Sequence, residues 1–353
     1  MRDAGGDGIC LQRWRASGPD FSAARRLRRP PGALQCLRLS RATFRRLGVL
    51  AFSLVLAVSA LAPPAFATGG GGRPSARTAP LARVRTFTYC VLGGVRLQMT
   101  IFEPLDGTRP APAVLQVHGG AWERGHRVRS LRQADGVDVG SLGTRDLVAQ
   151  GVVVASVAYE LAPASPWPSQ MQDVACAMRS LRAHAAQLGI DPSRIAVLGS
   201  SAGGQLASLL ATDPNAPAWS VGPYAQVSAQ PTALVDEFGP VELISGGFGR
   251  FMRHVLARVF GSVSPSSATL RAASPLQLVR PGDPPTLILQ GSADPVVPAS
   301  QSLAFAAALR RAGVPVQLVV VRGGGHGLRT PGESPPPPVL AAMVTRFLLS
   351  KLG

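Results

Sequence analysis

The five residues Gly199-Ser200-Ser201-Ala202-Gly203 place a serine between an apolar run and an apolar helical stretch. Residues 194–198 before them are predicted to form a strand, and residues 203–212 are predicted to form a helix. A G-x-S-x-G sequence in this context is typical of a nucleophile elbow, a sharp turn that exposes the serine hydroxyl at the end of a strand. The small residues around Ser201 allow this turn without side-chain clashes. The segment therefore predicts a strand–turn–helix unit that presents Ser201.

The same alternation of apolar runs and helical stretches continues along the chain from residue 83. Further strands are expected at 113–117, 152–159, 233–237, 286–290 and 316–321, and further helices at 144–150, 170–188, 299–312 and 339–352. Continuous apolar strands separated by helices predict a parallel sheet that is buried on both faces. Residues 84–89 and 95–102 flank a Leu92-Gly93-Gly94 turn and predict an antiparallel hairpin at the start. The expected fold class is α/β, with a mostly parallel central sheet and helices on both faces.

The first 67 residues have the pattern of a secretory signal peptide. Arg41, Arg45 and Arg46 precede an uncharged apolar run at 47–62, and Ala65-Phe66-Ala67 matches a cleavage site. The run has 16 residues, fewer than the roughly 20 that span a bilayer, so a stable membrane anchor is not expected. We expect a leader at 1–67, a flexible spacer at 68–82 and a catalytic domain at 83–353. The predicted location is secreted or periplasmic, after cleavage near Ala67; the true start codon stays open.

The basic character of the chain comes largely from this leader. Once the 11 Arg and 3 Asp of residues 1–67 are set aside, the net charge falls from +17 to +9. The remaining Arg residues are scattered, without the aromatic-interleaved basic stripe of a nucleic-acid binder, so no nucleic-acid partner is expected. Cys90 and Cys176 remain after cleavage, and a disulfide and two buried thiols are both compatible with the sequence. No Cys or His spacing fits a zinc site, so no metal is expected.

Candidates for the acid and the base follow two of the predicted strands. Asp294 lies in the loop after 286–290, and His326 lies between glycines after 316–321. A carboxylate can hold the histidine in the right tautomer, and the histidine can take the serine proton. The order Ser, Asp, His is that of α/β-hydrolases. A turn-forming Asp-Pro is the alternative for Asp294; Asp236 and Asp283 are the alternative acids, although Asp283 precedes its strand.

The segment His118-Gly119-Gly120-Ala121-Trp122 directly follows the strand at 113–117. The N–H groups of Gly119, Gly120 and Ala121, together with that of Ala202, are predicted to form an oxyanion hole, and each donor stabilises a transition state by about 3 kcal/mol. A plain Gly-Gly turn is the alternative for the loop. His118 is expected to fix the loop rather than to act as a base. The amphipathic stretch 248–260 fits either a small lid or an ordinary surface helix.

Together these motifs resemble those of the α/β-hydrolase esterases, in particular the feruloyl and acetylxylan esterase-like (BD-FAE) branch that is related to the hormone-sensitive-lipase family. The resemblance covers about residues 84–352. The motifs that carry it are His118–Trp122, Tyr159–Pro163, Asp191–Ile195, Gly199–Gly204, Gly239-Pro240, Ala273–Pro275, Pro284–Leu289 and Gly323–His326. It implies hydrolysis of carboxylic esters without a metal or organic cofactor. It also implies Ser201 as nucleophile, Asp294 as acid and His326 as base.

Two positions depart from the family pattern. Ala121 stands where the third glycine of the oxyanion loop is usual, and Glu160 stands where related chains have Arg. The short spacer before the first strand favours an uncapped esterase. We therefore expect an exported serine esterase whose substrate is a small-molecule or carbohydrate-linked ester. The alternatives are an amidase or peptidase, such as an aryl-formamidase, and a non-catalytic binding protein. The sequence leaves the oligomeric state open.

Overall fold

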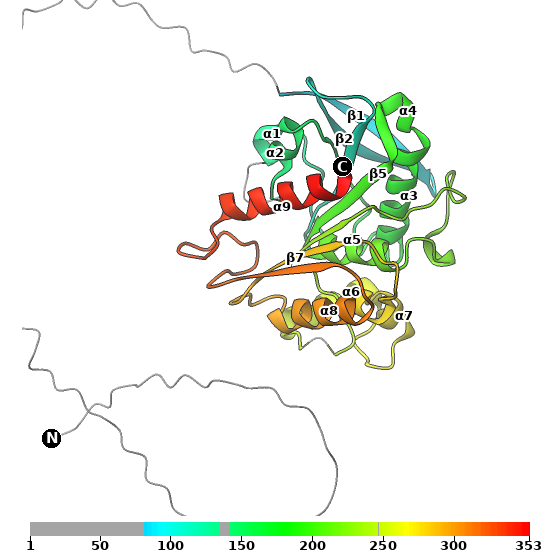
Figure 1. Ribbon diagram of the computed structural model, residues 1–353. Helices are drawn as coiled ribbons and strands as arrows, with labels where there is room; N and C mark the ends of the chain where they lie inside the picture. Colours follow the sequence, from blue (N-terminus) through cyan, green and yellow to red (C-terminus); the bar gives the residue numbers. More distant parts are fainter. Residues whose placement is uncertain (1–80, 135–141, 246) are drawn as a thin grey trace, which may run out of the picture. The chain divides into compact units, whose positions relative to one another are not determined.

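The eight strands of the described chain all join one sheet. The computed structural model describes residues 81–134, 142–245 and 247–353; the expected leader, and the spacer up to residue 80, lie outside the described residues. The strands are β1 Ala82–Leu92, β2 Val95–Pro104, β3 Ala111–Val117, β4 Val153–Val157, β5 Ile190–Ser200, β6 Leu234–Glu237, β7 Thr286–Gly291 and β8 Val316–Val321. Their order in the sheet is β1-β2-β4-β3-β5-β6-β7-β8 (Figure 1).

The pairing of these strands confirms the predicted fold class. β1 and β2 form the antiparallel hairpin, and β2 pairs antiparallel with β4. All pairs from β4 through β3, β5, β6 and β7 to β8 are parallel. The carboxyl ends of the parallel strands therefore meet at one edge, where a doubly wound sheet collects its functional loops.

Helices cover both faces of the sheet (Figure 1). They are α1 Leu131–Ala134, α2 Thr144–Ala149, α3 Ser169–Ala183, α4 Ala185–Leu188, α5 Ala202–Thr212, α6 Arg250–Phe260, α7 Ala268–Ala272, α8 Ala299–Arg311 and α9 Pro337–Leu352. Residues alternate along each strand between two buried apolar clusters, because successive side chains point to opposite faces. Leu115 and Val197 pack with α3, α5, α6 and α8, whereas Val114 and Leu198 pack with α2 and α9. Within the described residues, no helix is long and apolar enough to cross a bilayer.

Two helix predictions differ from the structure. The stretch 170–188, expected as one helix, is broken at His184 into α3 and α4, and the His184 Nδ1 lies 2.9 Å from the Ser180 carbonyl. The His184 N–H donates to the same carbonyl at 2.9 Å, so the helical hydrogen bond is kept at the break. The helix expected at 339–352 begins earlier, at Pro337, as α9. Proline is tolerated there because the first N–H groups of a helix have no intrahelical acceptor.

Cys90 of β1 and Cys176 of α3 form a disulfide, which decides the question that the sequence left open. Both residues are buried in the cluster that β1 shares with α3. The bond therefore fastens the antiparallel edge of the sheet to a helix that packs behind the central strands.

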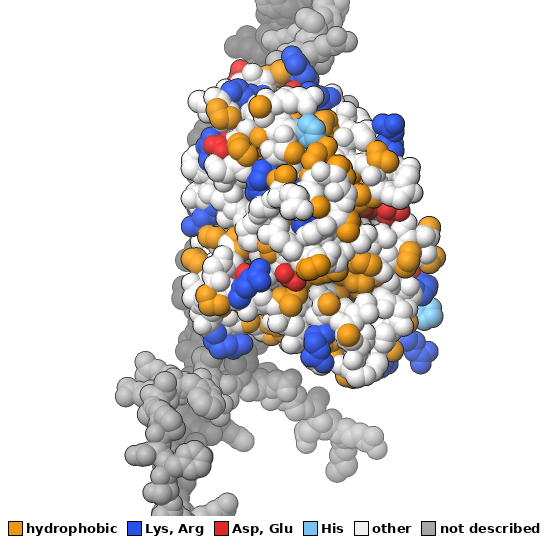
Figure 2. Space-filling view, turned by 90° about the vertical axis from the view of Figure 1, so that its right-hand side faces the viewer, with side chains coloured by type: hydrophobic (Ala, Val, Ile, Leu, Met, Phe, Trp, Pro, Cys, Tyr) orange, Lys and Arg blue, Asp and Glu red, His pale blue; other side chains and the backbone are white. Residues whose placement is uncertain are grey.

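On the face shown in Figure 2, the Lys and Arg side chains are scattered among uncharged ones.

Removal of this disulfide is expected to destabilise the protein. The two cysteines are 86 residues apart, and a cross-link of this span stabilises a fold by about 2–4 kcal/mol, mainly by restricting the unfolded chain. The Cys90→Ala/Cys176→Ala variant should therefore melt on the order of 5–10 °C below the wild type. Thermal unfolding followed by circular dichroism, with and without a thiol reductant, measures this difference. The reductant should lower the wild-type melting temperature and leave that of the variant unchanged; equal melting temperatures would contradict the prediction.

Candidate active site

Ser201 lies at the junction of β5 and α5 with a strained backbone. Its φ of 53° and ψ of −120° are uncommon for a residue with a side chain, and such strain is found at functional sites. The Ser201 N–H donates to the Glu237 carbonyl at 2.8 Å, which ties the turn to β6. A Cβ at Gly203 would lie 2.2 Å from the Val117 carbonyl oxygen, so only glycine allows α5 to approach β3 this closely. The predicted sharp turn is therefore present.

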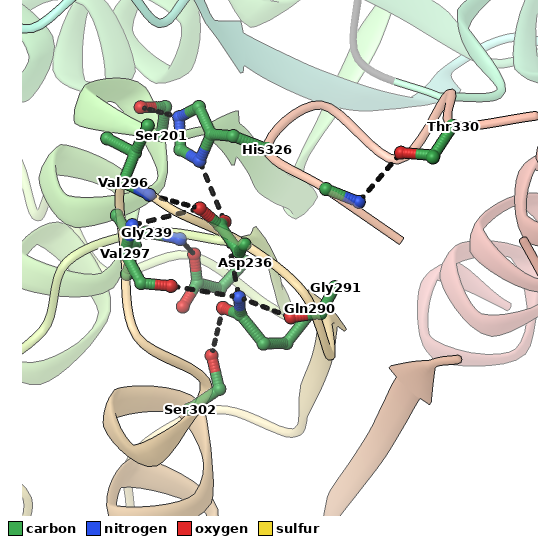
Figure 3. Close-up of polar contacts among 12 residues, drawn as sticks. Ser201, Asp236, Gly239, Gln290, Gly291, Val296, Val297, Ser302, His326 and Thr330 are labelled. Carbon is green, nitrogen blue, oxygen red and sulfur yellow. Dashed lines mark hydrogen bonds and ion pairs between the residues drawn. The ribbon is translucent and has the colours of Figure 1, made fainter. Parts of the chain in front are cut away.

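The three residues predicted to act on the ester are brought together across three loops, and Figure 3 shows Ser201 and His326 side by side. The His326 Nε2 lies 2.8 Å from the Ser201 Oγ, and the His326 Nδ1 lies 2.8 Å from an Asp294 carboxylate oxygen, Oδ2. Ser201 follows β5, Asp294 follows β7 and His326 follows β8. The imidazole thus connects the serine hydroxyl with the carboxylate, in the geometry by which a base can take the serine proton.

The carboxylate of Asp294 is fully buried and held by hydrogen bonds. Its Oδ1 accepts from the Val296 and Val297 N–H groups at 2.8 and 3.0 Å, and its Oδ2 also accepts from the Gln290 Nε2 at 3.2 Å (Figure 3). Burial by itself raises the pKa of this carboxyl, but hydrogen bonds from His326 and the two amides outweigh it, so the pKa lies below its usual value. Asp294 is thereby kept ionised beside His326.

Neither of the two alternative acids reaches His326. Asp236 is buried at the end of β6, where its Oδ1 accepts from the Gly239 N–H at 2.9 Å and burial raises its pKa to about 7. Asp283 precedes β7, at the opposite end of the strand from Asp294, and accepts from the Arg280 N–H. Of the three candidates, the structure places only Asp294 beside His326.

The loop after β3 lies next to Ser201. Gly120, Ala121 and Trp122 have φ values of 116°, 56° and 58°, so Ala121 adopts a left-handed conformation that glycine would take without strain. In the part of the chain that the structure describes, the N–H groups of Gly120, Ala121 and Ala202 donate to no other group. Gly119, Gly120, Ala121, Ser201 and Ala202 all line one pocket. The predicted oxyanion donors therefore lie together beside Ser201.

His118 supports this loop, as expected. Its Nδ1 lies 2.7 Å from the Gly119 carbonyl oxygen, and its ring stacks on that of Tyr159 with centroids 4.2 Å apart. The Tyr159 hydroxyl donates to the His118 carbonyl at 3.0 Å. Burial lowers the pKa of His118 to about 4, which keeps the ring neutral near pH 7. His118 thus stabilises the conformation of the loop from a buried position.

Gln205 is a positioning residue that the sequence analysis missed. It is fully buried in α5, one turn after Ser201. Its Oε1 accepts from the Trp122 indole N–H at 3.0 Å, and its Nε2 donates to the Ala273 carbonyl at 2.8 Å. The side chain therefore joins the strained oxyanion loop to the helix behind the nucleophile. A polar residue within the apolar stretch 203–212 was the available signal.

The pocket at Ser201 has a volume of about 560 Å³. Of the stretch 248–260, Phe251 and Met252 of α6 line it, so this helix contributes a wall of the pocket. The helix is held by an edge-to-face contact of Phe260 with Trp122 at 5.1 Å and by the bidentate ion pair of Arg258 with Glu123. Among the described residues, no three His, Cys, Asp or Glu side chains are grouped so that they could hold a metal ion.

Glu160, the second departure from the family pattern, makes no salt bridge within the described residues. Its carboxylate accepts from the Ser165 hydroxyl at 2.5 Å, and its N–H donates to Asp173 at 2.7 Å. Asp173 is buried, and burial raises its pKa to about 8. The charge of Glu160 acts in the same direction as burial and favours the neutral form of Asp173.

Comparison with known proteins identifies the family. The sequence profile of the BD-FAE family matches residues 99–309. The chain belongs to the BD-FAE family. The esterase LipQ of Mycobacterium tuberculosis is 35% identical over 211 residues, which are 58% of this chain and 47% of LipQ. The ethyl acetate hydrolase of Pseudomonas putida is 31% identical over 256 residues, 68% of this chain and 74% of that protein.

Solved structures of esterases share the fold of this BD-FAE chain. A truncated carbohydrate esterase from gut microbiota superimposes with a TM-score of 0.62 at 25% identity, over 78% of this chain and 98% of that one. Propionate-bound esterase Est2 of Thermogutta terrifontis superimposes with a TM-score of 0.61 at 26% identity, over 77% and 94% of the two chains. The fold is therefore that of an α/β-hydrolase. The chain spans about half the length of several curated relatives that it matches.

Proposed function

We propose that this protein hydrolyses carboxylic esters through an acyl-enzyme formed on Ser201. The observation that carries the proposal is the continuous hydrogen-bonded line from the Ser201 Oγ through His326 to the buried Asp294. Both ends of this line have the required surroundings, since the serine opens into a pocket and the carboxylate is ionised. The names of the relatives, which include several esterases, support the same reaction.

In the proposed mechanism, the Ser201 Oγ attacks the ester carbonyl while the His326 Nε2 takes its proton. The carbonyl oxygen becomes an oxyanion that the free N–H groups of the loop after β3 and of Ala202 bind. His326 then returns the proton to the departing alcohol, which leaves the acyl group on Ser201. Water attacks this acyl-enzyme with His326 again as base, and the acid is released. Asp294 holds the imidazole and stabilises its protonated form throughout.

We propose short acyl groups, or acyl groups linked to carbohydrate, as substrates. A pocket of about 560 Å³ is within the range for small-molecule sites. It lies beside Ser201, and its lining includes the polar side chains of Ser200, Glu237 and Arg329. The P. putida relative is named for ethyl acetate, and two of the similar structures are a carbohydrate esterase and an esterase with bound propionate.

We also propose that the protein is exported. The basic region at 41–46 and the apolar run up to Ala62 support a cleaved signal peptide. The Cys90–Cys176 disulfide is an independent support, because such bonds persist in oxidising compartments and are rare in the cytosol. The amino-terminal sequence of the secreted protein tests this proposal; a mature chain that starts near Thr68 is the expected result.

A series of p-nitrophenyl esters from acetate to decanoate tests the proposed activity. The purified protein should prefer acetate or butyrate, the short acyl groups proposed above, and should be labelled by a fluorophosphonate on Ser201. The matched p-nitroanilide should be cleaved far more slowly; faster cleavage of the anilide would favour an amidase. A protein that is inert to every ester and to the fluorophosphonate would support a non-catalytic binding role.

A further inference from the structure

The pocket at Ser201 has two chemically different sides, because it straddles the edge of the sheet. On the side of α6 and α8 it is lined by Trp122, Phe251, Met252 and Val296. These side chains are apolar and belong to or pack against the cluster on that face of the sheet, apart from the exposed Phe251. On the side of α2 and α9, the lining residues include Ser200, Glu237 and Arg329. One wall is thus apolar, and the other carries polar side chains beside the apolar Leu142 and Phe238.

The register of the strands places Ser200 and Glu237 next to each other on that second face. They are paired residues of the parallel strands β5 and β6. Leu198 and Val235, two residues before them, are buried in the cluster against α2 and α9. Because side chains alternate along a strand, Ser200 and Glu237 point to the same face as these two residues. The strand ends therefore offer a hydroxyl and a carboxyl side by side.

The Glu237 carboxyl is buried beside the pocket and has no role in the proposed mechanism. It is 1% exposed, yet it lines the pocket. Within the described residues, only one of its carboxyl oxygens, Oε1, is hydrogen-bonded, to the Leu142 N–H at 2.9 Å. A buried carboxyl with one such bond is costly, and burial raises its pKa to about 8. A carboxyl of this kind in a cleft is a candidate for a binding role.

Arg329 completes the polar side. It follows His326 by three residues in the loop after β8, and it lines the same pocket. Its positive charge acts on Glu237 and favours the ionised carboxylate, against the effect of burial. In the described parts of the chain Arg329 forms no ion pair. Its guanidinium donors are therefore free to bind a ligand near Glu237.

We propose that Ser200, Glu237 and Arg329 form a subsite that binds the hydroxyl groups of a sugar in the ester substrate. This inference rests on the proposed ester hydrolysis. A hydroxyl both donates and accepts, so it can satisfy a carboxyl and a guanidinium together. An alkyl group would leave both unpaired. The apolar side formed by Trp122 and Met252 remains for the less polar part of the substrate.

Two acetates of similar size test the subsite. Methyl 6-O-acetyl-glucopyranoside carries ring hydroxyls, and cyclohexylmethyl acetate lacks them; released acetate is measured for both. We expect Glu237→Leu to lower kcat/KM for the sugar ester about 10-fold or more, and to change that for the cyclohexyl ester less than 3-fold. Glu237→Gln should retain most of the sugar activity, because the amide still offers a donor and an acceptor. Arg329→Met should also lower kcat/KM for the sugar ester more than kcat/KM for the cyclohexyl ester.

Asp283→Asn provides the control, since it alters another buried carboxyl at the opposite end of the strands. It should leave the ratio of the two kcat/KM values unchanged. The subsite is refuted if Glu237→Leu and Arg329→Met lower both esters equally, which indicates a structural role, or if neither affects the sugar ester. If Glu237→Leu does not fold, Arg329→Met decides alone. Wild-type protein that hydrolyses neither acetate would refute the proposed ester hydrolysis itself.

Discussion

Ser201→Ala is expected to lower the turnover of p-nitrophenyl acetate by about 10⁶-fold. The substitution removes the hydroxyl on which the proposed acyl-enzyme forms, while the pocket residues remain. Within the described residues, the Ser201 side chain has a single hydrogen bond, to the His326 Nε2, so its loss should hardly affect folding. Steady-state kinetics at saturating ester, with the melting temperature as a control, measure both effects. Labelling by a fluorophosphonate should disappear together with the activity.

The outcome distinguishes a wrong nucleophile from a wrong substrate class. A variant that folds and keeps its rate would mean that another group is the nucleophile, and that the hydrogen bond to His326 is structural. An inactive wild type would instead mean that the ester class is wrong. The expected loss is large because a water molecule in place of the Ser201 Oγ is neither positioned as closely nor activated by the same hydrogen bond.

The strands and the turn at Ser201 could be predicted from the sequence because their signals are local. An apolar run such as 194–198 indicates a buried strand, and the small residues after it permit a sharp turn. Asp294 and His326 were recognisable because each follows such a run. Their meeting at Ser201 follows from the parallel arrangement, which collects the carboxyl ends of the strands at one edge.

Features that depend on distant partners could not be predicted in this way. Gln205 looks like an isolated polar residue in a helix until Trp122 and Ala273 are brought against it by the fold. Glu237 ends an apolar strand, and the sequence does not indicate that it lines the pocket. Arg179 is fully buried, and its guanidinium donates to the carbonyls of Pro214, Trp219 and Val227 in a later loop. Each of these positions is decided by tertiary contacts rather than by local pattern.

Asp294→Asn is expected to reduce kcat by about 10⁴-fold while leaving the fold intact. In the wild type, the His326 Nδ1–H donates to the carboxylate, which leaves the Nε2 as the acceptor of the serine proton. An asparagine can turn its NH₂ group toward the Nδ1 instead, and the imidazole then carries its proton on the Nε2. In that tautomer the ring donates to the Ser201 Oγ and cannot act as a base. The loss should hold across neutral pH, because the lowered pKa of Asp294 keeps the wild-type carboxyl ionised there.

Asp236→Asn is the matched control, because Asp236 is also a fully buried aspartate at the carboxyl end of a strand. Its Oδ1 accepts from the Gly239 N–H, and the amide oxygen of asparagine can accept the same hydrogen bond. We therefore expect this variant to change kcat only a few-fold. The comparison isolates the contact with His326 from the general cost of altering a buried carboxyl. If Asp236→Asn lost 10⁴-fold and Asp294→Asn did not, the acid would be Asp236, and the hydrogen bond between Asp294 and His326 would have no part in the reaction.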